Sequence, residues 1–213
     1  MRTQSTLDQL LCAFDVALQT IFIPKQRQSK RPNPAEGLTE PKLSAKQRRH
    51  TAGLMRVNHA GEVCAQALYQ GQALTARQNN IKEQMTQAAN EEVDHLAWCE
   101  QRLNELNASP SRLNPLWYLG SFVLGAGAGL LGDRWSLGFV AETENQVGTH
   151  LQNHLDKIST DDHKTAAILK QMHTDEVQHE TLAKQAGAAP LPPVVQHGMR
   201  CVSRLLTWGS YRV

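Results

Sequence analysis

One short pattern, a glutamate followed three residues later by a histidine, occurs at two distant places in the chain: Glu92 with His95, and Glu176 with His179. In an α-helix, residues three apart are separated by about 300° around the axis, so they share one face and can bind one metal ion together. A single pair of this kind is common on solvated helices. Its repetition is what indicates a metal site.

Another acid precedes each pair at a matching distance. Glu62 lies about 30 residues before Glu92, and Glu144 lies at about the same distance before Glu176. A carboxylate on one helix and Glu-x-x-His on its neighbour, repeated once, form the ligand set of dinuclear sites inside four-helix bundles. We therefore predict a two-metal site with six ligands: Glu62, Glu92, His95, Glu144, Glu176 and His179.

Four carboxylates and two imidazoles make a hard, mostly oxygen donor set. Such a set suits iron or manganese, whereas closed zinc sites use sulfur or more histidine. Two divalent ions would neutralise the four negative charges, which makes burial tolerable. Glu92 and Glu176 are expected to bridge the ions. Glu62 and Glu144 are expected to be terminal or chelating, with one histidine on each ion. Two ferrous ions can give two electrons to O2, and the ligands alone leave open oxygenation, ferroxidation, peroxide dismutation and radical generation.

Further polar residues stand next to these ligands in the sequence. Glu91 and Asp175 each precede a ligand glutamate, and we predict that each orients the histidine of the other half, with a simple solvated acid as the alternative. His150 lies six residues after Glu144, about 120° off its face, so it is expected at the edge of the pocket and not on a metal. No catalytic residue is predicted beyond the metal ligands. The other histidines with no predicted role are His50, His59, His163, His173 and His197.

Helical periodicity predicts the elements that must carry these residues. The expected helices span residues 44–77, 81–106, 136–158 and 163–186, with turns at Asn79-Asn80 and at residues 159–162. Ser44 is the expected N-cap of the first of these helices. Glu62 and the first Glu-x-x-His pair lie at similar distances from their turn, and the second half repeats that arrangement. The two halves are therefore expected to be duplicated antiparallel hairpins.

The segment from Leu113 to Gly132 contains no charged residue over 20 positions, long enough to cross a bilayer on length alone. A span would separate the hairpins and open the metal site, so we expect the long crossover of a ferritin-like bundle instead. Bundle core and a membrane-dipping segment are both open, and we favour the second because a core has little room for so much apolar surface. The residues expected to contact the membrane are Leu116, Trp117, Phe122 and Leu130.

Both ends of the chain are expected to add helices. Residues 5–22 predict an amphipathic helix, which Asp15 and the lack of a following cleavage site mark as mature sequence and not a signal peptide. Residues 24–43 are proline-rich and extended, and their basic run is interpreted as a solvated loop, with anionic lipid as the alternative partner. Residues 194–208 predict a basic amphipathic helix for the bundle or a membrane surface. The basic run consists of Lys25, Arg27, Lys30 and Arg31.

The bulk composition fits one domain over residues 1–213, with the motif region beginning after residue 43. A net charge of +2 with mixed signs gives no case for nucleic acid. Four scattered cysteines favour reduced thiols over a zinc or disulfide framework. The expected fold class is all-α, a ferritin-like four-helix bundle with a long apolar crossover and additional N- and C-terminal helices.

Four runs of sequence resemble the demethoxyubiquinone hydroxylase family, over about residues 44–213. All six ligand positions match that family's pattern. The resemblance implies hydroxylation of the ring of a prenylated methoxy-methyl-benzoquinol in ubiquinone biosynthesis, with two iron ions per chain as Fe²⁺, O2, and an external electron donor such as NADH. The runs are Arg56-Val57-Asn58-His59-Ala60-Gly61-Glu62, Glu91-Glu92-Val93-Asp94-His95-Leu96, Thr143-Glu144 with Val147 and His150, and Asp175-Glu176-x-x-His179.

The resemblance also implies a peripheral membrane protein that takes its polyprenyl quinol from the bilayer. The implied location is the cytoplasmic face of a bacterial cell membrane, or the mitochondrial inner membrane, with membrane lipid and other quinone-biosynthesis proteins as partners. A ferritin-like ferroxidase or iron-binding protein, or a manganese catalase, would share the ligands but need no apolar crossover. A non-catalytic scaffold of a membrane quinone-biosynthesis complex would keep the crossover but need not keep six intact ligands.

Overall fold

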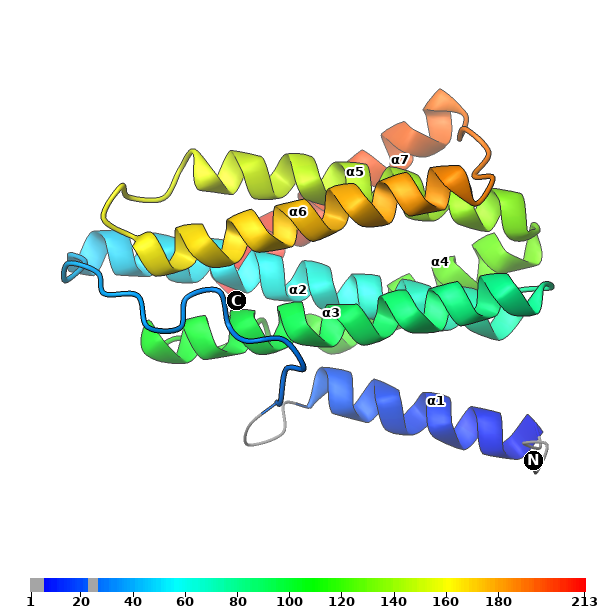
Figure 1. Cartoon of the computed structure of the whole chain (residues 1–213), viewed down its shortest axis with the longest axis horizontal. Coiled ribbons are helices and arrows are strands. Elements are labelled where there is room, and N and C mark those ends of the chain that lie inside the picture. Colours follow the sequence, from blue (N-terminus) through cyan, green and yellow to red (C-terminus); the bar gives the residue numbers. More distant parts are fainter. Residues whose placement is uncertain (1–5, 23–26) are drawn as a thin grey trace.

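A computed structural model of the chain describes residues 6–22 and 27–213, so Lys25 and the first residue of the predicted N-terminal helix lie outside the described part. Over that part the protein is all-helical, as predicted, and contains seven helices (Figure 1). Their bounds are α1 Thr6–Ile21, α2 Ala45–Thr75, α3 Asn79–Glu105, α4 Asn114–Leu130, α5 Asp133–Leu155, α6 His163–Gln185 and α7 Pro193–Arg212.

The four longest helices of the motif region form a bundle. Helices α2 and α3 make one antiparallel hairpin, α5 and α6 make the other, and α4 connects them (Figure 1). One apolar cluster, which includes Met55, Trp98 and Leu169, packs toward one end of the bundle, and another, which includes Tyr69 and Leu137, packs toward the other end. The predicted metal ligands lie between the two clusters in the sequence of every bundle helix. The core therefore encloses a polar centre from both ends.

The ends of the first hairpin show one confirmed and one wrong prediction. Ser44 is the N-cap of α2, and its hydroxyl and backbone form a capping box with Gln47, as its residue type predicts. Asn79 begins α3, so the turn lies before it and not at Asn79-Asn80. The physical reason is distant in the sequence. The backbone amides of Arg77 and Gln78 donate to the carboxylate of Asp133 at 3.0 and 3.1 Å, which fixes the turn at these residues.

Residues 27–43, which we call the strap, lie along the outside of the bundle against α3 (Figure 1). The solvated-loop interpretation is wrong for Arg27, which is buried and donates from Nε to Oε1 of Glu100 at 2.9 Å. Arg27 also donates to the backbone carbonyl oxygen of Gln19 near the end of α1, at 2.9 Å. A buried charge must be paired, and here its partner stands 73 residues away, beyond the reach of a local sequence pattern.

Helix α4 packs against α2 through glycine. A Cβ atom at Gly125 would lie 2.3 Å from the carbonyl oxygen of Leu68, and one at Gly71 would lie 2.3 Å from the carbonyl oxygen of Phe122. The two backbones therefore touch, which is the role of small residues at close helix crossings. The crossover is core on this face and exposed on the other. The core interpretation therefore holds for the face against α2, and membrane contact of the exposed face stays a prediction.

Replacing Gly125 by alanine should lower the free energy of unfolding by about 1–3 kcal/mol, because the new methyl group meets backbone that cannot rotate away. Gly120 is the matched control on the same helix, since a Cβ there meets no atom within 4 Å. Gly120→Ala should be neutral or stabilising, by up to about 1 kcal/mol. Thermal or urea unfolding followed by circular dichroism measures both. Equal stability of the two variants would contradict the backbone contact.

The four crossover residues expected at the membrane divide between the two faces of α4. Leu116 and Leu130 are exposed, whereas Trp117 and Phe122 are half-buried against protein, which limits their contact with any outside partner. The indole Nε1 of Trp117 donates to the hydroxyl of Ser210 on α7 at 3.0 Å. Among the described residues, no helix combines the length and apolar character that crossing a membrane requires.

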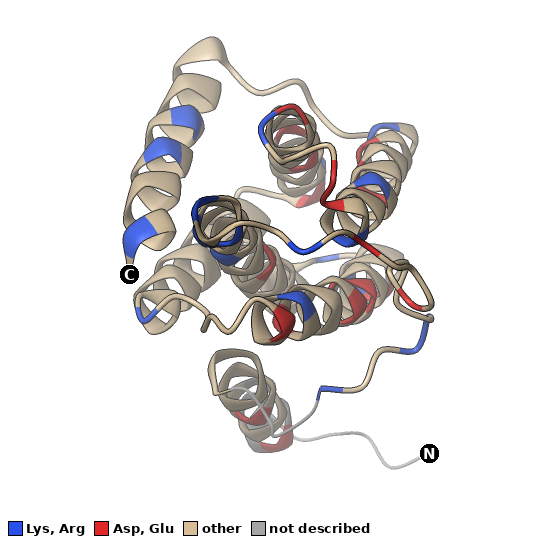
Figure 2. Ribbon diagram, turned by 90° about the vertical axis from the view of Figure 1, so that its left-hand side faces the viewer, with Lys and Arg blue, Asp and Glu red and all other residues tan. Residues whose placement is uncertain are grey.

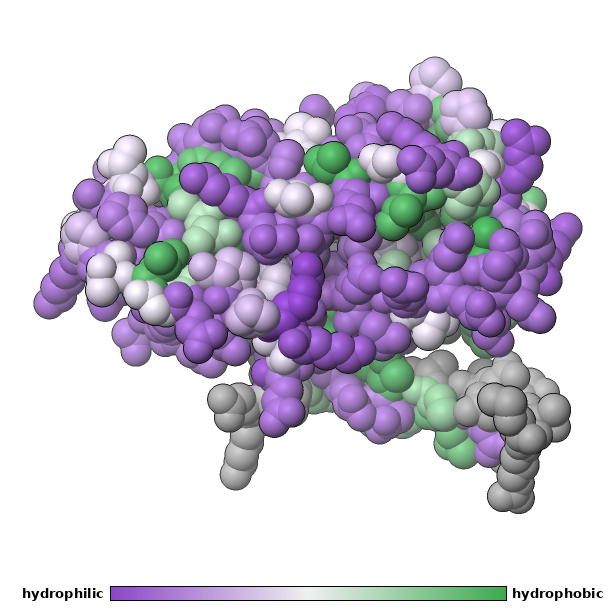
Figure 3. All heavy atoms as spheres, in the orientation of Figure 1, coloured by the Kyte–Doolittle hydropathy of each residue, from purple (hydrophilic) through white to green (hydrophobic). Residues whose placement is uncertain are grey.

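Apolar side chains are exposed along three helices outside the bundle. Figure 3 shows that the face formed by α3, α6 and the strap is mainly hydrophilic. Basic residues follow α7 toward the C-terminus (Figure 2), and among them are Arg200, Arg204 and Arg212. Among these exposed apolar residues are Leu11, Phe14, Leu18 and Phe22 on and next to α1, Leu116, Leu119, Val123, Leu124 and Leu130 on α4, and Val194, Val202, Leu205 and Trp208 on α7.

Candidate metal centre

The structure brings all six predicted ligands together inside the bundle. They form two groups, and within each group one ligand atom per residue lies within 4.8 Å of the others. Glu92 and Glu176 belong to both groups, whereas Glu62 and Glu144 each belong to one. This is the arrangement that two bridging and two terminal carboxylates would adopt. The groups are Glu62, Glu92, His95 and Glu176, and Glu92, Glu144, Glu176 and His179.

The first imidazole, His95, is held from both edges. Its Nδ1 atom faces the acids, 2.9 Å from Glu92 Oε2, 3.2 Å from Glu176 Oε1 and 3.6 Å from Glu62 Oε2. Its Nε2 atom lies 2.8 Å from Asp175 Oδ2. A carboxylate at Nε2 fixes the tautomer with its proton there, which leaves the Nδ1 lone pair for a metal.

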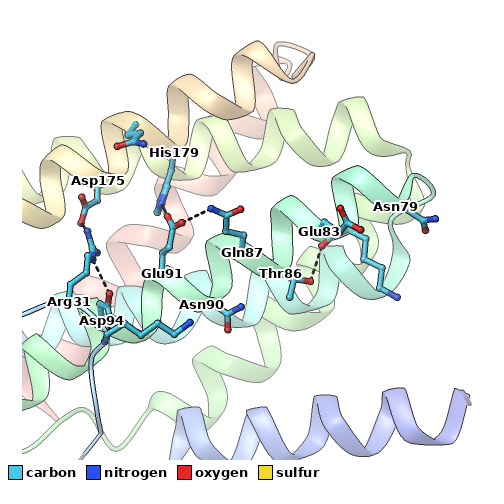
Figure 4. Close-up of a pocket in the computed structure, with 13 residues that line it drawn as sticks. Arg31, Asn79, Glu83, Thr86, Gln87, Asn90, Glu91, Asp94, Asp175 and His179 are labelled. Atoms are coloured by element: carbon cyan, nitrogen blue, oxygen red, sulfur yellow. Dashed lines mark hydrogen bonds and ion pairs between the residues drawn. The ribbon is translucent and has the colours of Figure 1, made fainter. Parts of the chain in front are cut away.

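The second imidazole, His179, repeats this geometry. Its Nδ1 atom lies 3.3 Å from Glu92 Oε1 and 3.3 Å from Glu176 Oε2. Its Nε2 atom lies 2.8 Å from Glu91 Oε2, and Figure 4 shows the two side chains pointing toward each other between α6 and α3. The structure thus places Glu91 and Asp175 each against the histidine of the other hairpin.

The two shared carboxylates each keep one buried oxygen without a hydrogen bond. These atoms are Oε1 of Glu92 and Oε1 of Glu176. Each lies near an imidazole Nδ1 atom, at 3.3 and 3.2 Å, but neither accepts a hydrogen bond from the described residues. Buried acceptors of this kind cost free energy unless another group binds them. One cation bound in each ligand group would satisfy both oxygens. The four carboxylates would balance the charge of two divalent ions. The residues present therefore fit a dinuclear metal centre.

The pKa shifts of the clustered acids and histidines also fit a metal centre. Burial raises the pKa of Glu62 and Glu144 well above the usual range, with repulsion from Glu176 adding to it. Burial also disfavours charge at Glu92, but the two imidazoles outweigh it and lower the pKa of Glu92 well below its usual range. Burial opposes a charged His179, yet hydrogen bonds and attraction from the acids raise the pKa of His179 to about 12. Protons therefore balance the charge of the bare cluster, and bound metal ions would displace them.

Two neighbours of the centre were missed in the sequence. Tyr69 is buried on α2, and its hydroxyl donates to Oε1 of Glu144. It lies seven residues after Glu62, which is nearly two full helical turns, so its place on the same face was readable from the spacing. Trp98 lies against His95, with ring centroids 5.4 Å apart. Trp98 is one turn beyond His95 on α3, and the same spacing argument applies to it.

An apolar cavity of about 410 Å³ lies against the α2 and α5 side of the centre. Glu62 reaches its wall, so the cavity leads to the metal centre from outside. His150 also lines it, and its buried Nε2 atom has no hydrogen-bond partner among the described residues. Burial lowers the pKa of His150 to about 4, so its imidazole is neutral near pH 7. Helices α4 and α7 close the cavity with Ser121, Leu124, Val195, Met199, Val202 and Leu206.

A polar groove of about 860 Å³ lies on the opposite side, between α3, α6 and the strap. Figure 4 shows Asp175 and His179 reaching into it from α6, opposite Glu91 on α3. Arg31 of the strap lies between Asp94 and Asp175, to which it is ion-paired at 2.9 and 2.8 Å (Figure 4). The solvated-loop interpretation is therefore wrong for Arg31 as well, for the same reason as for Arg27: its partners stand on helices far along the chain.

A family model described as ubiquinone biosynthesis protein COQ7 matches residues 49–210, most of the chain. The chain belongs to the COQ7 family. The resemblance predicted from the four sequence runs is thereby confirmed. The residues of this chain that match the COQ7 model include the six candidate ligands, the apolar cavity and α4. The match begins after α1 and the strap.

Named relatives cover all or nearly all of the chain. A protein of Legionella pneumophila (strain Corby), named 3-demethoxyubiquinol 3-hydroxylase, is 59% identical over 213 residues, all of both chains. Proteins of the same name are 55% identical in Azotobacter vinelandii, over all of this chain and 98% of that one, and 52% identical in Chromobacterium violaceum, over 97% of this chain and all of that one. The strap and α1 are thus aligned in these full-length relatives although they precede the COQ7 match.

Proposed function

We propose that the protein is a 3-demethoxyubiquinol 3-hydroxylase, a monooxygenase that hydroxylates the ring of a polyprenyl methoxy-methyl-benzoquinol in ubiquinone biosynthesis. The observation that carries this proposal is the apolar cavity, whose wall includes Glu62 of the candidate metal centre. A storage site for iron needs no apolar route to its metals. The family match and the names of the relatives support the same activity.

The six ligand residues are proposed to hold two iron ions, with Glu92 and Glu176 between them. When bound, two ferrous ions supply two electrons together to O2, which overcomes the slow reaction of triplet oxygen with a singlet ring. One oxygen atom enters the ring as hydroxyl and the other leaves as water. Each turnover therefore consumes two electrons from an external donor, for which NADH is our candidate, and two protons, one from NADH and one from solvent.

The chain's own residues bind and orient the quinol. The cavity excludes water around the ring, and its length along α2 points the ring toward Glu62. The neutral imidazole of His150 offers Nε2 as an acceptor for a ring hydroxyl of the quinol, which would satisfy a nitrogen that otherwise lacks a partner. Tyr69 of α2 holds Glu144 of α5 in place at the centre. These contacts fix which carbon of the ring faces the metals.

The polyprenyl tail is proposed to leave the cavity between α4 and α7 and to remain in lipid. Leu124 and Val202 line the cavity and are also exposed at the surface, so an apolar path connects the interior with the outside. The exposed leucines of α4 and the basic side chains of α7 suit an anionic membrane surface. The proposed location is the cytoplasmic face of a bacterial cell membrane, as a peripheral protein.

The activity is tested with ferrous-loaded protein, a short-tail demethoxyquinol, a reductant and ¹⁸O2. The expected result is a product heavier by one ¹⁸O atom, with O2 consumed only when quinol is present. A ferroxidase would consume O2 with excess Fe²⁺ alone, a catalase would release O2 from peroxide, and a scaffold would do neither. Any of these three results without labelled product would refute the proposed function.

Changing Leu116, Leu119 and Leu130 together to serine should lower binding to anionic liposomes by at least about tenfold. These side chains are 60%, 62% and 66% exposed, and each would gain roughly 1.5–3 kcal/mol on full transfer to an apolar phase. Turnover of a long-tail quinol in vesicles should fall with binding, while turnover of a short-tail analogue should persist. Vesicle flotation and product analysis measure the two effects.

The matched control for the liposome experiment is Leu182→Ser on α6, which removes an exposed leucine from a helix not expected at the membrane. It should bind vesicles as the unchanged protein does. Unchanged flotation of the triple variant would contradict attachment through α4. Trp117 and Phe122 are left intact in this design because both pack against protein.

A further inference from the structure

The carboxylates that hold the two histidines of the centre differ in exposure and in the residues that contact them. Asp175, the partner of His95, has a side chain only 11% exposed. It accepts a hydrogen bond at Oδ1 from Gln171 Nε2 at 2.9 Å, and its Oδ2 atom is ion-paired with Arg31 Nη1 at 2.8 Å. The carboxylate that holds His95 is therefore itself held at both of its oxygens.

The corresponding partner of His179 is less constrained. The side chain of Glu91 is 41% exposed and faces the polar groove between α3 and α6. It accepts a hydrogen bond from Gln87 Nε2 at 3.0 Å, one helical turn away, and no described strap residue forms a hydrogen bond or ion pair with it. The duplicated hairpins thus place equivalent acids in unequal surroundings.

Arg31 accounts for most of this difference. Its Nε atom donates to Asp94 Oδ2 at 2.9 Å, so the guanidinium joins an acid on α3 to Asp175 on α6. Its central carbon lies 4.8 Å from the ring centroid of Trp98, and that ring packs against His95. Arg31 therefore contacts both groups that hold His95. Its Nη2 atom also lies 3.4 Å from Nε2 of His95 itself. Because the proton on Nε2 is directed at Asp175, Nε2 cannot accept from Arg31, and Arg31 acts on His95 through the carboxylate. The flat, always charged fork of arginine suits this double contact.

We propose that Arg31 is a positioning residue for His95, acting through Asp175, and that it makes the two metal positions unequal, with tighter binding at the His95 position. This inference rests on the proposed two-metal centre. A carboxylate held in one rotamer orients its histidine at no further entropic cost when the metal binds. The guanidinium also draws charge from Asp175, which weakens the hydrogen bond to His95. We therefore expect an effect of about tenfold in metal affinity, the lower end of the range for groups behind a ligand.

Metal affinity is measured without turnover, by titrating metal-free protein with Co²⁺ and following its visible absorption. The unchanged protein should bind two ions in two steps. Arg31→Gln should weaken the tighter step about tenfold and leave the other step unchanged. Asp175→Asn should weaken that same step, and Glu91→Gln should weaken the other one. Arg31→Lys keeps the charge but loses the fork, so it should fall between the unchanged protein and Arg31→Gln.

The matched control for this titration is Lys30→Gln, because the exposed Lys30 side chain precedes Arg31 and only its backbone amide contacts Asp94. It should bind Co²⁺ as the unchanged protein does. Because Arg31 acts through Asp175, the double variant Arg31→Gln, Asp175→Asn should bind no more weakly than Asp175→Asn alone, whereas general loosening of the fold would multiply the two effects.

Two results would overturn the role of Arg31: wild-type affinity for both ions in Arg31→Gln, or effects that multiply in the double variant. Failure of the unchanged protein to bind two Co²⁺ ions is a different outcome. It would refute the proposed dinuclear centre itself. Circular dichroism of the metal-free variants verifies that each remains folded.

Discussion

Glu92→Ala should lose both metal ions together, and with them all quinol hydroxylation. Glu92 is shared by both ligand groups and carries a buried oxygen for which the described residues provide no hydrogen-bond partner, so its loss removes one donor from each ion. Glu176→Ala should behave in the same way. Glu144→Ala removes a donor from one group only and should keep at least one ion. Metal analysis per chain after gel filtration, beside the labelled-product assay, measures these outcomes.

The matched control for the shared ligands is Glu180→Ala, one helical turn beyond Glu176 on α6. Glu180 is ion-paired with Lys184 and belongs to neither ligand group. It should keep two ions and full activity. A full complement of metal in Glu92→Ala or Glu176→Ala would exclude the bridging role of that residue, and loss of metal in Glu180→Ala would point to a general effect on α6.

Gly61→Leu should abolish turnover of the quinol while both metal ions remain bound. Gly61 lines the apolar cavity next to Glu62, and a Cβ atom added to it would meet no atom within 4 Å. The leucine side chain can therefore enter the cavity without displacing the bundle, and it would occupy the space of the ring. Steady-state kinetics with quinols of decreasing ring substitution, together with metal analysis, measures this separation of binding from metal content.

Gly127→Leu on α4 is the control for cavity filling, because a Cβ there also meets open space but Gly127 does not line the cavity. It should hydroxylate the quinol as the unchanged protein does. Wild-type turnover in Gly61→Leu would show that the ring does not use this cavity. Loss of metal in that variant would instead show that a side chain at residue 61 disturbs the position of Glu62.

The helices and the grouping of the six acids and histidines were predictable because both depend on local periodicity. A Glu and a His three residues apart share a helix face whatever the rest of the chain does, and the repeated distance to an earlier acid adds the second helix of each hairpin. Tyr69 follows from the same rule applied two turns beyond Glu62. Its omission was a failure to extend the pattern and not a lack of signal.

What local patterns missed depends on distant partners. The turn before α3 is set by Asp133, and Arg27 and Arg31 of the strap are ion-paired with Asp94 and Glu100 on α3 and Asp175 on α6. A run of basic side chains carries no mark of such partners, so solvation was the natural prediction. The sequence likewise did not predict which face of α4 is buried, because that depends on the close contact between Gly125 and the backbone of α2.

The glycine contact between α2 and α4 also bears on which quinols are accepted. Helix axes pack about 8–10 Å apart, and glycine at the contact favours the short end of that range. In the proposed membrane orientation, the lipid-facing side of α4 is thus about one helix layer from α2, which carries Glu62. Only the head of the quinol and the first part of its tail need to cross that layer. Catalytic efficiency should therefore level off after the first few isoprene units, so one chain can serve quinones of different isoprenoid lengths.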